Sequence, residues 1–203
     1  MGKIPNEFPD MGALFEKPYT EFEFDGKIYK VGPTVGGHNG VGPQACQAHP
    51  PSYDSVRGRW VVHVDNNLIH IDYSGQDEPR IVFGDDSPFT QLVIQNNPDP
   101  AFRSGGILVT ETTSADAEPE YPVDCEFTMH LKATVPGVPS LVTREPLRLI
   151  ANGLEEWPPP VGTVYKNQSG AEFFLEGPAA ESDQPMARIL PGDSTVLTEV
   201  FTL

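Results

Sequence analysis

The sequence is poor in cysteine and in basic residues, and it has no long apolar run. Its 203 residues include two cysteines, Cys46 and Cys125, which lie far apart and form no Cys-x-x-Cys motif. Two cysteines can form at most one disulfide within the chain, which is too few for a disulfide-rich fold. No segment approaches the about 18 apolar residues of a membrane-spanning helix, and the N-terminus lacks the apolar stretch of a signal peptide. These features predict a cytoplasmic protein that does not bind membranes.

The charge is strongly one-sided. Thirteen Lys and Arg residues stand against 29 Asp and Glu residues, and the formal net charge is −16. Nucleic-acid binding needs clustered Lys and Arg to contact phosphates, so we expect no nucleic-acid partner. Segment 32–51 is rich in glycine and proline and is predicted to be a loop; it contains neither a Walker A sequence nor a dinucleotide fingerprint followed by a helix. We therefore expect no organic cofactor.

Glycine and proline, in contrast, are abundant, with 19 and 22 residues. Such a composition excludes a helix bundle or a coiled coil. The 11 Phe, 6 Tyr and 2 Trp residues are enough for a sizeable core. The best candidate for a helix is segment 147–154, which is also predicted in part as a strand. The Trp157-Pro158-Pro159-Pro160 run is a rigid connector and the one plausible domain boundary.

Short runs with period-two alternation, separated by polar turns, predict strands along most of the chain. Beyond the two hairpins described next, these strands are expected at 80–84, 90–95, 107–113, 125–135, 147–151, 163–166, 171–176, 188–190 and 195–203. The pattern is typical of an all-β protein with a single domain at 19–203. We predict an antiparallel β-sandwich, with a β-barrel as the alternative, long Gly/Pro-rich loops, and an extended N-terminal arm at 1–18.

Segment 19–31 carries a strong hairpin signal. Asp25-Gly26 suits a type I′ turn, because both residues tolerate a positive φ. Pairing outward from this turn places Phe22 opposite Tyr29 and Glu21 opposite Lys30. An aromatic pair on one face and an ion pair on the other is typical of a half-buried hairpin.

A second hairpin is predicted at 59–74, with its turn at Asn66-Asn67. Trp60, Val62, Ile69 and Ile71 would then be buried, and the opposite face would carry His63, His70, Asp65 and Asp72. In this register His63 and His70 are directly opposed, with their Cβ atoms about 5 Å apart. Two imidazoles and a carboxylate are common transition-metal ligands, so the candidate metal site is His63, His70 and Asp72. A solvated polar face is the alternative interpretation.

Two further patterns suggest weaker sites. Asp85, Asp86 and Asp99 lie in predicted loops and carry the oxygen ligands that Ca²⁺ prefers, although no EF-hand spacing is present. Cys46 lies three residues before His49 and close to Asp54, which is compatible with a nucleophile and its base. Acidic turns and a structural cysteine explain the same residues without a site.

Two classes of function remain open from the sequence. The first is a non-enzymatic β-sandwich module for assembly or partner binding, self-associating or binding a protein through its N-terminal arm. The second is a small-molecule-binding β-barrel or sandwich that acts as a cofactor-independent lyase, isomerase or cyclase, with His63 and His70 in its site. The first is favoured because no recognisable catalytic motif is present.

Overall fold

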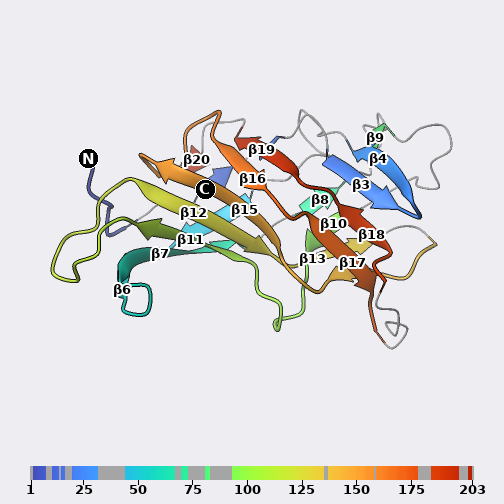
Figure 1. The fold of residues 1–203 in the computed structure, drawn as a ribbon, viewed down its shortest axis with the longest axis horizontal. Coiled ribbons are helices and arrows are strands. Elements are labelled where there is room, and N and C mark those ends of the chain that lie inside the picture. Colours follow the sequence, from blue (N-terminus) through green and yellow to red (C-terminus); the bar gives the residue numbers. More distant parts are fainter. Residues whose placement is uncertain are drawn as a thin grey trace.

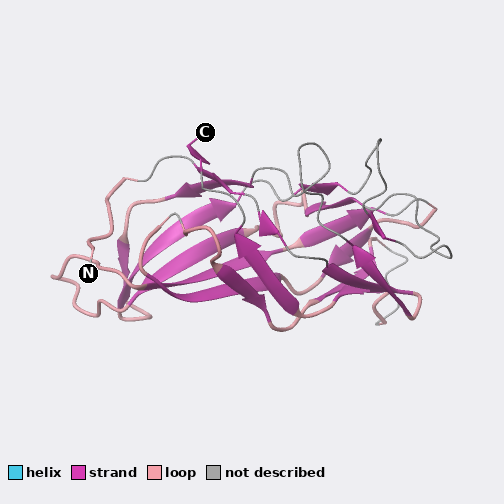
Figure 2. Ribbon diagram, turned by 90° about the horizontal axis from the view of Figure 1, so that it is seen from above, coloured by secondary structure: helices cyan, strands magenta, loops and turns pink. Residues whose placement is uncertain are grey.

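The protein is all-β. The computed structural model describes residues 2–7, 11–13, 15–16, 20–31, 44–66, 70–72, 81–82, 93–134, 137–157, 159–177, 184–196 and 201–202. Every regular element among these residues is a strand (Figure 2). The described part of the chain accordingly holds no helix that spans a membrane.

The larger of two antiparallel sheets has eleven strands. They are β1 (Met11–Ala13), β2 (Phe15–Glu16), β5 (Gln44–Ala48), β6 (Ser52–Asp54), β7 (Arg59–Asn66), β11 (Gly105–Thr110), β12 (Val123–Met129), β15 (Leu147–Leu154), β16 (Val164–Asn167), β19 (Gly192–Val196) and β20 (Phe201–Thr202). Their order is β2-β19-β16-β15-β12-β11-β7-β5-β1-β20, with β6 paired to β7.

The smaller sheet has nine strands, in the order β8-β10-β13-β14-β17-β18-β3-β4-β9. These are β3 (Thr20–Phe24), β4 (Lys27–Val31), β8 (His70–Asp72), β9 (Ile81–Val82), β10 (Val93–Asn96), β13 (Leu131–Thr134), β14 (Leu141–Thr143), β17 (Ala171–Leu175) and β18 (Ala187–Ile189). The two sheets lie one after the other along the long axis of the molecule (Figure 1).

The two sheets are connected by strands that follow one another in the chain. The order β7-β11-β12-β15-β16-β19 in the larger sheet matches β8-β10-β13-β14-β17-β18 in the smaller one. Each matched pair is consecutive in sequence, so the chain runs as a long meander that passes through both sheets. We call the described segments between matched strands the waist; they are 97–104, 130, 144–146, 168–170 and 190–191.

The larger sheet closes on itself. β1 pairs with β5 on one side and with β20 on the other, while β2 pairs with β19, which pairs with β16. Because β1 and β2 are consecutive, as are β19 and β20, these pairings form a ring. A ring of about eight strand positions is just wide enough to be filled by side chains. The barrel alternative therefore describes this half of the molecule.

The core of the molecule is one cluster of buried side chains from both sheets. Tyr165 is fully buried in the larger sheet, where its ring lies 5.8 Å from that of Phe127. Phe22 and Phe173 are fully buried in the smaller sheet, with their rings 6.1 Å apart in an edge-on arrangement. Burial of large aromatic side chains is the main favourable contribution to a fold of this kind.

Side chains replace ladder hydrogen bonds at the waist. The Thr143 hydroxyl accepts a hydrogen bond from the N–H of Leu131 at 2.8 Å, and Thr143 is 1% exposed. The amide oxygen of buried Asn167 accepts from the N–H of Gly170 at 2.8 Å. Leaving such groups unpaired in the interior costs about 1–3 kcal/mol each. The waist is therefore a fixed part of the fold.

The predicted hairpin at 19–31 is confirmed in its register. Glu21 pairs with Lys30 and Phe22 with Tyr29 in the ladder of β3 and β4. Asp25 and Gly26 have φ values of 50° and 70°, as a type I′ turn requires. The residues of the turn were enough to predict this pairing.

The predicted hairpin at 59–74 is wrong. β7 pairs with β11 and with β5, whereas β8 lies in the other sheet and pairs with β10. The period-two pattern of 59–66 fits either partner. The strand that follows β7 in the chain, β8, belongs to the other sheet instead of pairing back with β7. Val62 is buried as expected and His63 is exposed, whereas Trp60, expected to be buried, is only partly so. The side chains of Ile69 and Ile71 lie outside the described part of the structure.

Two other expectations change. Segment 44–48, predicted within a loop, is strand β5, and the helix candidate at 147–154 is strand β15. Trp157, at the start of the proline-rich run, is buried in the common core. Its ring packs 6.2 Å from that of Phe127.

The described part of the N-terminal arm packs on its own chain. The N–H of Ile4 donates to the Pro119 carbonyl at 3.0 Å, and that of Tyr121 to the Gly2 carbonyl at 3.0 Å. Ile4 is 5% exposed and belongs to the core. Further along, β1 and β2 are members of the larger sheet. Self-association through this arm stays a prediction.

The waist predicts an unequal response to two glycine substitutions. Gly170 and Gly137 have φ values of 70° and 78°, so alanine costs about 1–2 kcal/mol at either position. A Cβ at Gly170 would also overlap the carbonyl oxygen of Ile189. At Gly137, in contrast, no described atom lies within 4 Å of the added Cβ. Overpacking adds about 1–3 kcal/mol, so Gly170→Ala should lower the free energy of unfolding more than Gly137→Ala. Urea unfolding measures both, and equal losses would contradict a rigid waist.

Candidate functional site

The predicted metal site loses the strand pairing on which it depended. His63 lies on β7 of the larger sheet, whereas His70 and Asp72 lie on β8 of the smaller sheet. At His63 both edges of β7 are occupied, by Ile107 on one side and by the backbone of His49 on the other. No free edge is left for β8. The side chains of His70 and Asp72 lie outside the described part of the structure, so metal binding there stays a prediction.

The neighbour of His63 is a different histidine. The ladder pairs Ala48 with Val64, and the N–H of His49 donates to the His63 carbonyl at 2.8 Å. His49 therefore lies opposite His63 on the outer surface of the barrel, with its Nε2 atom 2.8 Å from an Asp65 oxygen. Within the described ranges, no three His, Cys, Asp or Glu side chains are arranged to hold a metal ion. This group is an exposed polar surface.

The two weaker sequence candidates find structural roles where they are described. Asp54 closes the turn between β6 and β7, and the hydrogen bond from the Arg57 guanidinium lowers the pKa of its carboxyl. An Asp99 oxygen accepts from the N–H of Ala101 at 2.9 Å, within the turn of 97–104. Asp85 and Asp86 lie outside the described residues, as does the side chain of Cys46.

One histidine at the waist is partly buried. His130 joins β12 to β13, and its Nδ1 atom is buried without a hydrogen-bond partner among the described residues. The Phe102 ring lies 5.2 Å from the imidazole. Burial lowers the pKa of His130, with a smaller opposing effect from the Glu145 carboxylate. A neutral imidazole is therefore favoured at this position.

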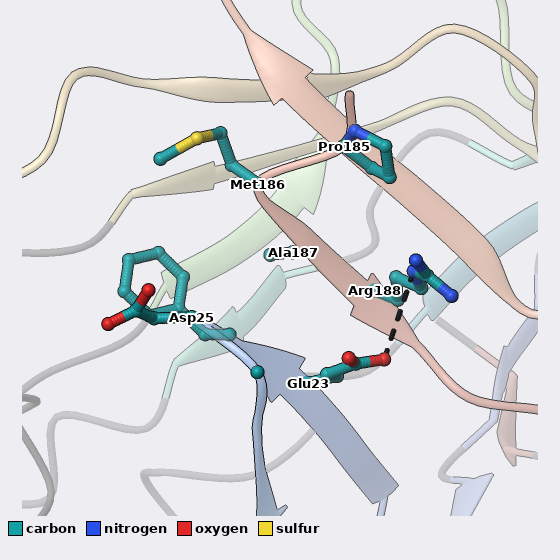
Figure 3. Close-up of a pocket in the computed structure, with 8 residues that line it drawn as sticks. Glu23, Asp25, Pro185, Met186, Ala187 and Arg188 are labelled. Atoms are coloured by element: carbon teal, nitrogen blue, oxygen red, sulfur yellow. Dashed lines mark ion pairs between the residues drawn. The ribbon is translucent and has the colours of Figure 1, made fainter. Parts of the chain in front are cut away.

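A pocket of about 390 Å³ lies at the far end of the smaller sheet (Figure 3). It is lined by Glu23, Phe24, Asp25, Gly26, Pro185, Met186, Ala187 and Arg188. The β3–β4 turn and the start of β18 form it, because β18 pairs with β3 at Ala187 and Phe24. The pocket thus joins two segments that are about 160 positions apart in the chain.

The pocket wall has an apolar part and a charged part. Phe24 packs against the common core and Ala187 is buried, while Met186 is 38% exposed. Figure 3 shows Met186 extending away from the Glu23–Arg188 ion pair. The Arg188 Nε atom lies 3.8 Å from Glu23 and 3.7 Å from Glu172, which is beyond hydrogen-bond distance. Four apolar side chains and three charged ones therefore line this site.

The sequence predicted only one of the two segments that form this pocket. Asp25-Gly26 was identified as a turn, but Pro185, Met186 and Arg188 carry no motif that singles them out. Their position follows from the pairing of β18 with β3, which joins strands distant in sequence. A local pattern does not report such a pairing.

The comparisons with known proteins identify a fold. No protein-family model matches this sequence, and no curated protein matches it. Among solved structures, the chain is similar to DynF from the dynemicin biosynthesis pathway of Micromonospora chersina. The TM-score is 0.58 over 97% of this chain and 85% of DynF, at 14% sequence identity. At this identity the two chains share an all-β architecture.

The buried imidazole predicts a pH-dependent stability. Because the folded pKa of His130 is lowered, its neutral form stabilises the fold fully above about pH 6.5, the unfolded value. This contribution is lost as the pH falls from about 6.5 through the folded pKa. We expect the difference in free energy of unfolding between the native protein and His130→Gln to decline over this range, as measured by urea unfolding. A constant difference from about pH 8 to 5 would show that His130 is not buried in its neutral form.

Proposed function

We propose that this protein binds an apolar small molecule in the pocket between the β3–β4 turn and β18. The proposal rests on one observation: in this pocket, apolar side chains that belong to or pack on the core lie next to an apolar side chain exposed to solvent. Phe24 and Ala187 belong to the apolar interior of the smaller sheet, and exposed Met186 stands beside them. An apolar ligand would pack against these side chains and cover apolar surface that is now exposed to solvent.

The size and lining of the pocket suit this role. A volume of about 390 Å³ falls within the roughly 300–1,000 Å³ of small-molecule sites. Methionine is flexible and polarisable, so Met186 can adjust to ligands of different shape. Glu23, Asp25 and Arg188 at the rim provide polar groups that orient a ligand.

The similarity to DynF supports the same class of function at the level of the fold. DynF comes from a biosynthetic pathway, where proteins handle small molecules. Because unrelated functions share folds, this argument has the strength of an analogy. It favours small-molecule binding over the assembly module that the sequence favours.

A fluorescent apolar probe tests the proposal. N-phenyl-1-naphthylamine is uncharged and brightens on entering an apolar site, and we expect saturable binding to the native protein. Met186→Asn removes half-exposed apolar surface from the pocket and should weaken binding about three- to tenfold. The matched control is Val56→Asn, since Val56 is 93% exposed in the β6–β7 turn.

The control separates this pocket from other apolar surfaces. Val56→Asn should leave the probe affinity unchanged, because Val56 lines neither described pocket. Equal affinity in the native protein and in Met186→Asn would reject the pocket as the binding site. Absence of saturable binding to the native protein would reject apolar-ligand binding itself.

A further inference from the structure

A second pocket lies at the opposite end of the molecule, beside the N-terminal segment. Its volume is about 440 Å³, and it is lined by Lys3, Ile4, Pro5, Asn6, Pro51, Trp60, Ala115, Asp116, Ala117, Glu118 and Pro119. The loop between β11 and β12 and the N-terminus meet at this end of the larger sheet (Figure 1). The proposed function does not use this pocket.

Backbone hydrogen bonds hold the walls of this pocket in place. Lys3 and Glu120 form an antiparallel bridge, flanked by the bonds from Ile4 to Pro119 and from Tyr121 to Gly2. The loop itself closes through the N–H of Ala117, which donates to the Ser114 carbonyl at 3.2 Å. A preorganised wall lowers the entropic cost of binding a ligand.

The aromatic part of the wall is Trp60, whose orientation is fixed. Its Nε1–H donates to the Ser114 carbonyl at 3.0 Å. The Tyr53 ring packs edge-on against the indole at 5.8 Å, and the Tyr53 hydroxyl donates to the Thr113 carbonyl at 2.9 Å. A fixed indole is the best aromatic partner for a cation, because its π-electrons carry negative charge on the ring face.

The charged part of the wall is predominantly acidic. Asp116 and Glu118 line the pocket together with one cation, Lys3. The Lys3 ammonium is ion-paired with Glu118, whose carboxylate raises the pKa of Lys3, and Glu120 adds a smaller effect of the same sign. The pocket therefore already holds an ammonium group at one carboxylate and has a second carboxylate in its wall.

We propose that this pocket binds a small organic cation of the ammonium class, with Trp60 contacting its apolar surface and Asp116 and Glu118 its charge. The pairing of Lys3 with Glu118 shows where an ammonium is accepted. An anionic ligand would be repelled by the two carboxylates in the pocket wall. The net charge of −16 further concentrates cations around the molecule.

Choline and its uncharged isostere 3,3-dimethylbutan-1-ol test this proposal. The two molecules have nearly the same shape, so a difference in affinity isolates the charge. The two indole N–H signals in a ¹H–¹⁵N spectrum report binding, and Trp60→Phe assigns the signal of Trp60. We expect choline to shift the Trp60 signal saturably and to bind about three- to tenfold more tightly than the neutral isostere at constant ionic strength.

Charge variants give the sign of the interaction. Glu118→Gln should weaken choline binding, whereas Lys3→Met should strengthen it, because it frees Glu118 from its internal partner. Both side chains are about 70% exposed, so neither change is expected to unfold the protein. The matched control is Glu172→Gln, which makes the same charge change on β17, away from this pocket.

Each other outcome would overturn the proposal. Equal affinity for choline and the neutral isostere would make the pocket an apolar site without charge recognition. Weaker choline binding in Lys3→Met would show that Lys3 does not compete with the ligand. A loss in Glu172→Gln as large as in Glu118→Gln would assign the effect to net charge. No saturable shift of the Trp60 signal up to about 10 mM choline, a concentration at which a site with a Kd of about 1 mM is about nine-tenths occupied, would exclude the site.

Discussion

The fold depends on how backbone hydrogen bonds are satisfied at the waist. Strands that pass from one sheet to the other interrupt their ladders there, and the freed N–H groups lie in or near the common core. Thr143, Ser104 and Asn167 supply the missing acceptors, at 2.8, 3.1 and 2.8 Å. Asn167 also donates to the Leu190 carbonyl at 3.4 Å, which ties two crossings together. These short polar side chains let the meander bend while the backbone N–H groups of Leu131, His130 and Gly170 keep their hydrogen bonds.

Local chemistry predicted the parts of the fold that depend on neighbouring residues. The β3–β4 register follows from Asp25-Gly26, and the strand character of 59–66 follows from its alternation. The pairing partner of strand 59–66 does not follow from its alternation, because the apolar inward face of this strand can pack beside any strand that also has an apolar inward face. The Asn66-Asn67 pair reads as a turn in the sequence, yet the next strand belongs to the other sheet. Long-range pairing decided between a hairpin and a crossing.

The same limit explains the candidate sites. His63 was correctly placed on the outward face, but its histidine neighbour is His49, from a segment that the glycine and proline content had marked as a loop. Both pockets are formed by segments distant in sequence, as with Trp60 and residues 115–119. Turns, alternation and motifs describe contacts within about ten residues, so such sites become visible once the sheet order is known.

The filling of the barrel accounts for where the two pockets lie. In the larger sheet, Phe127, Trp157 and Tyr165 pack together inside the ring, with ring centroids about 6 Å apart. An interior of this diameter, filled by aromatic side chains, leaves little volume for a guest. The two ligand-sized concavities described among the residues of the structure lie where strands end and where loops or the N-terminal segment meet the sheet edge. The polar groups at both ends are mostly carboxylates, so the acidity of the sequence is carried into the chemistry of its pockets.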